Sequence, residues 1–452
     1  MKVSVIGTGY VGLVTGVCLA EIGNDVICVD KIDDKVDTLK KGKSPIYEPG
    51  LENLIKKNLE AERLFFTTSI PEAVAESDII FISVGTPSLP NGQADLSYVE
   101  QVAIDIGKFI NGKKIVVNKS TVPIGSGDWV SMIISESIEA NNTNKNVSFE
   151  VVSNPEFLRE GSAVEDTFFP DRIIVGSSSK QAIERMLGLY RPLIEQDFDW
   201  PEDERLIPEG QKVPVVVTDL TSAEMIKYAS NSFLATKISF INEMANICEK
   251  VGADVTHVAK GMGLDKRIGP QFLKAGIGWG GSCFPKDVSA LAYIAGEHGI
   301  TPQILNSIIN VNKEQRLKII QKVQDELKDV NGKTVSVLGI SFKPNTDDTR
   351  DAPGISIMNS LCKLGAKVRA YDPIVKDRPV LLNEKIEICA DKYDALEKAD
   401  VLILATEWDE FVQIDFDRVK KLMNNHLIID GRNIFDRKNL EKQGFKYFGI
   451  GR

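Results

Sequence analysis

The apolar residues of this chain fall into two α/β patterns separated by a helical stretch. Up to about residue 200, short apolar segments alternate with amphipathic helical ones. The strands expected from this alternation are Val3–Ile6, Val26–Asp30, Ile79–Val84, Ile115–Asn118, Glu150–Ser153 and Arg172–Val175. Strands that alternate with helices are typical of a doubly wound, mostly parallel sheet.

From Asp219 the apolar period becomes that of long helices, expected over Ser222–Val251, Val255–Gly261, Val288–Glu297 and Gln303–Leu327. A second α/β pattern begins at Lys333. Its expected elements are a strand at Thr334–Gly339, a helix at Gly354–Leu364, and strands at Lys367–Asp372, Val401–Thr406 and Leu427–Asp430. We therefore predict an α/β protein of two Rossmann-like doubly wound domains, residues 1–213 and 330–452, joined by a central helical domain, residues 214–329, with a long core helix.

Composition narrows the function. The 452 residues exceed a single ordinary core, and the net charge of −10 argues against a nucleic-acid partner or an anionic membrane surface. No apolar run reaches the ~18 residues of a membrane span. The six cysteines form no C-x-x-C pair, and a strand begins at residue 2 with no signal peptide before it, so a reducing, cytoplasmic location is expected. The three histidines lack metal-ligand spacing, so no metal is expected.

A glycine fingerprint follows the first strand. Gly7-Thr8-Gly9-Tyr10-Val11-Gly12 precedes a helix of small apolar residues, and the next strand ends in Asp30, about 20 residues further on. The full arrangement predicts a pyrophosphate on the helix N-terminus and ribose hydroxyls on Asp30. An acid at this place repels a 2′-phosphate, so NAD is favoured over NADP, although Lys35 lies close in sequence.

Cys283 ends a loop of four glycines, Gly276-Ile277-Gly278-Trp279-Gly280-Gly281-Ser282-Cys283, and Pro285 follows at the first turn of an expected helix. Unpaired backbone N–H groups and the helix dipole favour a thiolate at such a position. The alternative, a buried structural cysteine beside a glycine turn, is disfavoured by this local chemistry. Cys283 is therefore the candidate nucleophile.

Other polar segments are also candidates for ligand binding. Val84–Pro87, Lys119–Pro123 and Asn154–Gly161 each follow a strand at the sheet edge where ligands bind, and the last presents Glu156 and Glu160. Spacing places Glu224, Lys227 and Asn231 on one helix face, either as an oxygen-binding set or as a solvated stripe. Phe342–Arg350 contains cations where the first α/β pattern has glycines. This segment is either a diphosphate-binding loop or a salt-bridged surface loop. The acidic segment 196–212 is expected to be a solvated surface connector.

Together these strings resemble the UDP-glucose 6-dehydrogenase family of nucleotide-sugar dehydrogenases over almost the whole chain. The resemblance is carried by G-x-G-Y-V-G-L, Y-E-P-G-L (47–51), V-G-T-P, K-S-T-V-P, N-P-E-F-L-R-E-G, Y-A-S-N-S-F-L-A-T-K, G-G-S-C-F-P-K-D, F-K-P-N-T-D-D-x-R and D-G-R-N (430–433). It implies that UDP-glucose, two NAD and water give UDP-glucuronate and two NADH. Segment 196–212 is longer than is usual for the family, which puts the local surface and assembly in question.

The resemblance also implies roles. Cys283 would form a thiohemiacetal and then a thioester, Lys227 and Asn231 would stabilise the C6 oxyanion, Asp287 would support proton transfer, and Glu156, with Thr121 through water, would be the base for hydrolysis. The NAD contacts would be Gly7, Gly9, Tyr10, Val11, Gly12, Asp30, Lys35, Thr86, Thr121, Glu160, Lys286 and Arg350. The UDP-sugar contacts would be Glu156, Phe157, Leu158, Arg159, Glu160, Lys227, Asn231, Arg267, Phe272, Leu273, Lys274, Ala275, Gly276, Gly280 and Lys343. Arg267 would reach the substrate of a neighbouring subunit, and the helical middle would form the core of a homodimer.

Three alternatives remain. A 2-hydroxy-acid dehydrogenase would need a histidine paired with a carboxylate, and no histidine lies in such a turn. A non-catalytic NAD-binding regulator would not need Cys283 in its glycine loop. The same thiol chemistry on GDP-mannose or a UDP-N-acetylhexosamine is the runner-up, although N-K-S-T-V-P and L-R-E-G-S-A look more like the UDP-glucose branch.

Overall fold

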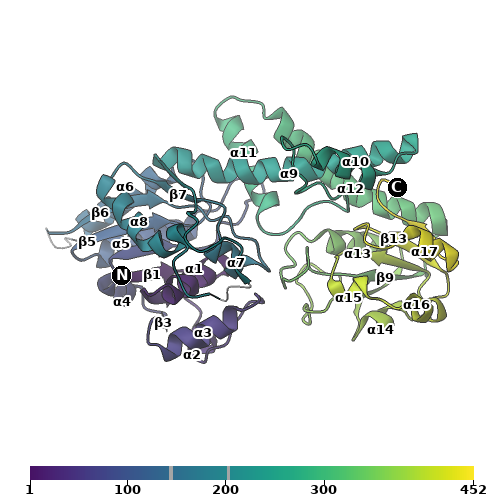
Figure 1. Cartoon of the computed structure of the whole chain (residues 1–452), viewed down its shortest axis with the longest axis horizontal. Coiled ribbons are helices and arrows are strands. Elements are labelled where there is room, and N and C mark those ends of the chain that lie inside the picture. Colours follow the sequence, from purple (N-terminus) through teal and green to yellow (C-terminus); the bar gives the residue numbers. More distant parts are fainter. Residues whose placement is uncertain (142–145, 201–203) are drawn as a thin grey trace. The chain divides into compact units, whose positions relative to one another are not determined.

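The computed structural model describes residues 1–141, 146–200 and 204–452. The chain divides into two compact units, Met1–Ala229 and Ser230–Arg452 (Figure 1). The long helix α9 (Leu220–Val251) begins in the first unit and continues into the second. Each unit is built around its own parallel or mostly parallel sheet.

The sheet of the first unit has the order β3-β2-β1-β4-β5-β6-β7-β8, and its first six strands are parallel. β7 runs antiparallel to β6, and β8 runs parallel to β7. The strands are β1 (Lys2–Ile6), β2 (Asp25–Val29), β3 (Leu64–Thr67), β4 (Ile79–Ile82), β5 (Lys113–Asn118), β6 (Ser148–Ser153), β7 (Ile173–Gly176) and β8 (Val215–Thr218). This is the order of a doubly wound dinucleotide-binding sheet with two further strands at one edge.

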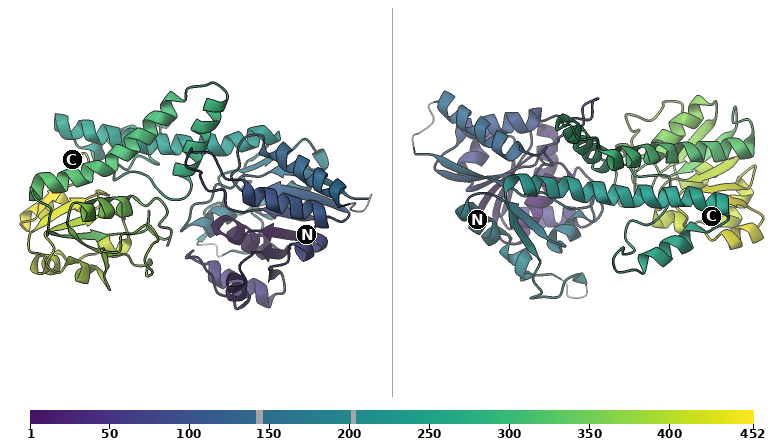
Figure 2. Two further views of the ribbon diagram at one scale, coloured as in Figure 1. Left: turned by 180° about the vertical axis from the view of Figure 1, so that it is seen from behind. Right: turned by 90° about the horizontal axis from the view of Figure 1, so that it is seen from above.

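Helices cover both faces of this sheet (Figure 2). Alternate residues of one strand serve the two faces: Phe81 packs into one core, and its neighbours Ile80 and Ile82 into the other. The helices are α1 (Tyr10–Glu21), α2 (Asp33–Lys40), α3 (Leu51–Glu60), α4 (Ile70–Glu76), α5 (Ser97–Phe109), α6 (Ser126–Ala140), α7 (Ala163–Phe168) and α8 (Lys180–Glu195). The core is therefore apolar on both sides of the sheet, and the polar turns lie at the ends of its strands.

The expectation of a solvated connector at 196–212 is wrong for its first part. Phe198 and Trp200 pack against Phe168 and Phe169 of the first core, with ring centroids 4.8 to 5.8 Å apart. Arg205 donates to the carbonyl oxygens of Gln196 and Phe198. The high acidic content hid two aromatic side chains whose burial outweighs it. Residues 201–203 of the segment lie outside the described residues.

The second unit combines helices with a six-stranded parallel sheet of order β11-β10-β9-β12-β13-β14. Its strands are β9 (Thr334–Leu338), β10 (Lys367–Tyr371), β11 (Glu387–Ile388), β12 (Val401–Leu404), β13 (Leu427–Asp430) and β14 (Lys446–Phe448). Its helices after α9 are α10 (Val255–Gly263), α11 (Phe284–Glu297), α12 (Gln303–Leu327), α13 (Pro353–Lys363), α14 (Lys392–Leu396), α15 (Asp409–Val412), α16 (Phe416–Leu422) and α17 (Arg437–Lys442). When each sheet is numbered from its own first strand, its first six strands have the same order, so the second α/β pattern is a second Rossmann-like sheet.

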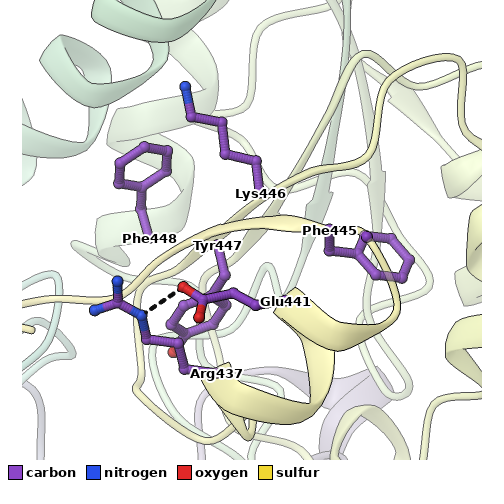
Figure 3. A pocket seen from close by; sticks show the side chains of 7 residues that line it. Arg437, Glu441, Phe445, Lys446, Tyr447 and Phe448 are labelled. Atoms are coloured by element: carbon purple, nitrogen blue, oxygen red, sulfur yellow. Dashed lines mark hydrogen bonds and ion pairs between the residues drawn. The ribbon is translucent and has the colours of Figure 1, made fainter.

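A hollow of about 450 Å³ lies on the second unit beside α17 and the edge strand β14. Figure 3 shows its lining, in which Arg437 is paired with Glu441 beside Phe445, Lys446, Tyr447 and Phe448. None of the site residues expected from the sequence lines it.

Two features are absent from the described ranges, 1–141, 146–200 and 204–452. None of their helices combines the length and the apolar character that a bilayer crossing requires. They also hold no group of three or more His, Cys, Asp or Glu side chains that could bind a metal ion.

Candidate functional site

The glycine turn after β1 has the geometry that a dinucleotide requires. Gly7 has φ 102°, and a Cβ there would lie 2.5 Å from the carbonyl oxygen of Ser83. A Cβ on Gly12 would lie 1.9 Å from the carbonyl oxygen of Gly7, so both glycines are required for packing. A Cβ on Gly9 would meet nothing within 4 Å, so no packing within the described residues requires this glycine. Open space at the start of α1 is what a pyrophosphate needs for close approach to the backbone.

Asp30 lies directly after β2 and is already part of a hydrogen-bond network. Its Oδ2 accepts from the Thr8 hydroxyl at 2.6 Å and from Lys35 Nζ at 2.8 Å, and its Oδ1 accepts from the Ile32 N–H. Burial raises the pKa of Asp30, but the hydrogen bonds from Lys35, Thr8 and Ile32 outweigh this and hold it below its ordinary value. The carboxylate is therefore ionised near neutral pH, as an acceptor of ribose hydroxyls must be.

The two polar turns after β4 and β5 are tied together. The Thr86 hydroxyl donates to the Thr121 carbonyl oxygen at 2.8 Å, and the Ser120 hydroxyl donates to the Val84 carbonyl oxygen at 2.7 Å. Parallel neighbouring strands bring their carboxyl ends to one edge, so the sheet order itself places these turns side by side.

Lys227 and Glu156 form a buried ion pair in the first unit. Lys227 Nζ lies 2.8 Å from Glu156 Oε1 and 2.7 Å from the Glu156 carbonyl oxygen, and only 4% and 5% of the two side chains are exposed. The Leu158 N–H donates to Glu156 Oε2 at 2.9 Å. The carboxylate thus has donors on both oxygens, which fixes its position relative to the amine.

A second buried amine, Lys119, belongs to this cluster. Its Nζ donates to Asn154 Oδ1 at 3.1 Å, and the Tyr190 hydroxyl donates to the same oxygen at 2.6 Å. Burial lowers the pKa of Lys119 to about 8; the Glu156 carboxylate opposes this shift and the Lys227 amine adds to it. A buried amine whose pKa is lowered this far, beside an ion pair, favours a functional site over an ordinary core.

In the second unit, Cys283 is the N-cap of α11 and Pro285 lies in the first turn of the helix. The Asp287 N–H donates to the Cys283 carbonyl oxygen at 2.8 Å. Asp287 is fully buried; its Oδ2 accepts from Asn231 Nδ2 at 2.6 Å, and its Oδ1 pairs with Lys286. The half-buried thiol therefore stands at the end of the helix dipole where negative charge is stabilised.

The glycine loop before Cys283 is held on two sides. On one side, Asn312 and Arg316 of α12 bind the backbone of Trp279. On the other, a Cβ on Gly281 (φ 82°) would lie 2.7 Å from the Phe342 ring, and a Cβ on Gly280 would lie 2.2 Å from a carbonyl oxygen of the 342–353 loop. Only glycine permits these two close contacts. The glycines at 280 and 281 are therefore explained by close packing, and at Gly281 also by the positive φ.

Comparison with known proteins identifies the family of the chain. Family models for the UDP-glucose/GDP-mannose dehydrogenase family match residues 1–194 (NAD binding domain), 221–314 (central domain) and 336–437 (UDP binding domain). The chain belongs to the UDP-glucose/GDP-mannose dehydrogenase family. It is therefore an NAD-dependent dehydrogenase with a three-domain α/β architecture, as the sequence predicted.

Individual relatives agree with the family models. The chain is 48% identical to the UDP-glucose 6-dehydrogenase TuaD of Bacillus subtilis, covering 100% of this chain and 93% of the relative. It is 47% identical to a UDP-glucose 6-dehydrogenase of Rhizobium meliloti, covering 100% of both. A solved UDP-glucose dehydrogenase from Pyrobaculum islandicum superposes with a TM-score of 0.88 at 37% identity, covering 99% of this chain and 97% of that one.

The residues at the glycine turn and Asp30 fit the NAD that this dehydrogenase family uses. Val11 lies in the first turn of α1, and Thr86 and Thr121 are linked as described above. Glu160 lies in a loop whose next residues, Gly161 and Ala163, donate backbone N–H groups to Glu48 at 2.6 and 2.7 Å. Lys286 pairs with Asp287, and Arg350 pairs with Asp348 at 2.8 Å, in the second unit.

The residues expected to contact the sugar nucleotide fall into two sets. The first unit holds Glu156, Phe157 and Arg159. The Arg172 guanidinium lies 3.7 Å over the Phe157 ring, and Arg159 binds Asp166. The second unit holds the others. There Gly276 is bound through its N–H by Asn242 and through its carbonyl by Gln315, and Lys343 Nζ lies 5.5 Å over the Phe342 ring.

Other residues of these sets differ in exposure. Arg267 is 88% exposed and paired with Asp265. Phe272 has φ 62°, whereas Leu273 and Ala275 are buried. Within the segment expected to contact the sugar nucleotide, Lys274 is exposed, whereas Gly276 and Gly280 are buried.

Sequence reasoning missed three residues that touch the site. Lys119 lies within K-S-T-V-P and Glu48 within Y-E-P-G-L, but neither motif alone indicates a buried charge. Arg432, within D-G-R-N, donates to the carbonyl oxygens of Ala405 and Phe342 and pairs with Glu407. Each lies within a motif that the resemblance already quotes, and that was the signal available for each.

Proposed function

We propose that this protein oxidises the C6 alcohol of UDP-glucose to the carboxylate of UDP-glucuronate, using two NAD and one water. The placement of Cys283 at the start of α11, with Asp287, Asn231 and Lys286 joined beside it, carries the proposal. A dehydrogenase that stops at the aldehyde has no need of such a thiol. The UDP-glucose 6-dehydrogenases to which the chain is similar support UDP-glucose as substrate.

The protein's own residues would act in a fixed order. In the first half, the C6 hydroxyl gives up its proton, a hydride leaves the C6 carbon, and the sugar becomes an aldehyde. NAD, when bound, supplies the hydride acceptor for this and the later oxidation. The Cys283 sulfur then bonds to the aldehyde carbon, and the carbonyl oxygen becomes the oxyanion of a thiohemiacetal. Lys227 and Asn231 would stabilise that oxyanion.

In the second half, loss of a second hydride from C6 turns the thiohemiacetal into a thioester. Water attacks the thioester carbon, the carbon–sulfur bond breaks, and the thiolate leaves while a proton passes to a base. We assign that base to Glu156, with Thr121 holding the water, and assign support of proton transfer to Asp287. Net, one alcohol becomes one carboxylate, and four electrons leave the sugar as two hydrides.

Replacing Cys283 tests this proposal. Wild type is expected to yield two NADH per UDP-glucose with no aldehyde trapped by a hydrazine reagent. Cys283→Ser is expected to bind UDP-glucose normally but to oxidise supplied UDP-aldehyde far more slowly, because a serine alkoxide is scarce near neutral pH. Cys362→Ser, at another half-buried cysteine, is the matched control and should behave as wild type.

Two results would reject parts of the proposal. A Cys283→Ser enzyme with wild-type rate and stoichiometry would remove the thioester. A panel of UDP-glucose, GDP-mannose and UDP-N-acetylmannosamine, followed by NADH absorbance, decides the sugar nucleotide. Faster turnover of either alternative substrate would keep the thiol chemistry and replace UDP-glucose.

We infer that the functional form is a homodimer formed through the helical middle. Phe233, Phe240 and Ile247 repeat every seven residues on α9, and 66% of Phe233 is exposed. A helix stripe of large apolar residues in water favours a partner surface. Phe233→Glu should give a monomer in light scattering, whereas Met132→Glu, at an exposed apolar residue of α6, should not. A dimeric Phe233→Glu would move the interface elsewhere.

We also infer a reducing, cytoplasmic location, because no disulfide joins the six cysteines, all of which lie within the described residues.

A further inference from the structure

A buried carboxylate on α9 binds the start of α6. Glu224 Oε2 accepts from the Gly125 N–H at 2.6 Å, and its Oε1 accepts from the Gly127 N–H at 2.8 Å. Gly125 is the N-cap of α6, and the first N–H groups of a helix have no partner within the helix. Glu224 supplies those partners from 97 to 99 residues away in sequence.

This arrangement differs from an ordinary helix cap. Caps usually come from a local Ser, Thr, Asp or Asn that remains in contact with water. Glu224 is only 3% exposed, and a buried carboxylate costs free energy unless donors surround it. A Cβ on Gly127 would lie 3.2 Å from Glu224 Oε1, so the two helices approach closely at this point. The contact therefore fixes the distance between α6 and α9 more strictly than a local cap would.

Both ends of this contact continue directly into the site. On α6, the preceding residues are the 119–123 turn that carries Thr121. On α9, Lys227 follows Glu224 by three residues, on the same helix face. A hollow of about 10 Å³, room for about one water molecule, is lined by residues from both: Ser120, Thr121, Val122, Ser153, Pro155, Glu224 and Lys227.

We propose that Glu224 is a positioning residue for the reaction, whose bonds to Gly125 and Gly127 hold the Thr121 turn at a fixed place relative to the Lys227 amine. The inference rests on the proposed function in assigning roles to Thr121 and Lys227. The proposal requires that the water-sized hollow keeps its shape only while Glu224 near the start of α9 is hydrogen-bonded to the start of α6. The substrate and NAD are not bound by Glu224 itself.

Glu224→Gln tests the inference, because the amide has the same shape but presents an NH₂ group to one of the two donors. Hydrogen exchange measured without ligands should rise in peptides covering 119–130. Glu48→Gln, which weakens another buried carboxylate contact of this unit, should raise exchange around 159–166 and leave 119–130 unchanged. These exchange readouts do not depend on which sugar nucleotide is the substrate.

The kinetic readout separates positioning from stability. Glu224→Gln should lower kcat roughly ten- to a hundredfold, as small displacements of catalytic groups do, while both KM values stay within about threefold. Asn58→Ala, which removes a fully buried amide with several hydrogen bonds on α3, is the stability-matched control and should keep its kcat.

Three results would overturn the inference: unchanged exchange at 119–130, a kcat within about twofold of wild type, or an equal loss of kcat in Asn58→Ala at equal loss of Tm. If wild type instead prefers another sugar nucleotide, the kinetic comparison is made on that substrate. The proposed function would then be corrected while the role of Glu224 is still tested.

Discussion

The Lys227–Glu156 pair offers a stability measurement that separates structure from chemistry. Both side chains are almost fully buried, and two donors from Lys227 reach Glu156. Removing one partner of a buried pair typically costs about 3–5 kcal/mol, because the other charge is left uncompensated. The Leu158 N–H and the neighbouring Lys119 amine still face Glu156 after Lys227→Met, so we expect the low end, about 3 kcal/mol.

Glu156→Gln in the Lys227→Met background removes the uncompensated charge. The double variant should therefore be more stable than Lys227→Met, with a coupling free energy of about 2 kcal/mol. Activity should not return with stability, because the oxyanion loses its cation in both variants. Urea unfolding, read by hydrogen exchange in peptides of Met1–Ala229, isolates the unit that holds both residues, since the whole chain need not unfold in one step.

The exposed pair Lys56–Glu52 on α3 is the matched control. Its side chains are about half exposed, and the same double-mutant cycle there should give no more than about 0.5 kcal/mol. A coupling at Lys227–Glu156 no larger than that of the control would refute the argument from burial. Recovery of activity in the double variant would refute the assignment of Lys227 to the oxyanion.

Three further predictions follow from single residues. Burial, with the Asp128 charge adding to it, raises the pKa of Glu224 to about 7, while the Gly125 and Gly127 N–H groups act to lower it. Because the pKa is higher in the folded than in the unfolded chain, the contribution of Glu224 to stability is fully present below the unfolded pKa and is lost as pH rises through about 7. The unfolding free energy of Glu224→Gln minus that of wild type should therefore grow by up to about 3 kcal/mol between about pH 5 and pH 8, and a flat difference would reject the shift. Gly281→Ala should cost more in urea unfolding than Gly299→Ala, because both have a positive φ but only Gly281 faces the Phe342 ring; equal costs would mean that backbone strain alone matters. Asp30→Ala should lower the NAD to NADP ratio of kcat/KM, and an unchanged ratio would remove Asp30 from cofactor choice.

Much of the fold could be predicted because its signals are local. The apolar strands, the helix Gln303–Leu327 and the strand Leu427–Asp430 have the expected bounds or differ by a few residues. α11 begins at Phe284 rather than Val288, since Pro285 in its first turn extends the helix towards Cys283. The four edge strands β3, β8, β11 and β14 were missed, because an edge strand is only partly buried and carries a weaker apolar pattern than a central one.

The site was harder to predict because its contacts join distant residues. Lys227 was assigned a role, but nothing in its spacing indicates that Glu156, 71 residues earlier, is its partner. The same holds for Glu224 and the glycines of α6. Spacing on one helix predicts which side chains share a face, whereas the identity of what faces them depends on the sheet order, which the sequence alone left open.

The two Rossmann-like sheets show how the same local pattern leads to different uses. Each has an acid directly after its second strand. Asp30 accepts from the Thr8 hydroxyl and the Lys35 amine as well as from the backbone N–H groups of Thr8 and Ile32, and it is not fully buried. Asp372 is 1% exposed, and its oxygens accept from the backbone N–H groups of Ile340, Ser341, Ile374 and Val375. The buried Asp372 therefore holds the turn after β9, and we propose that the second sheet recognises its ligand through the cations of the 342–350 loop instead, one of the two interpretations that the sequence left open.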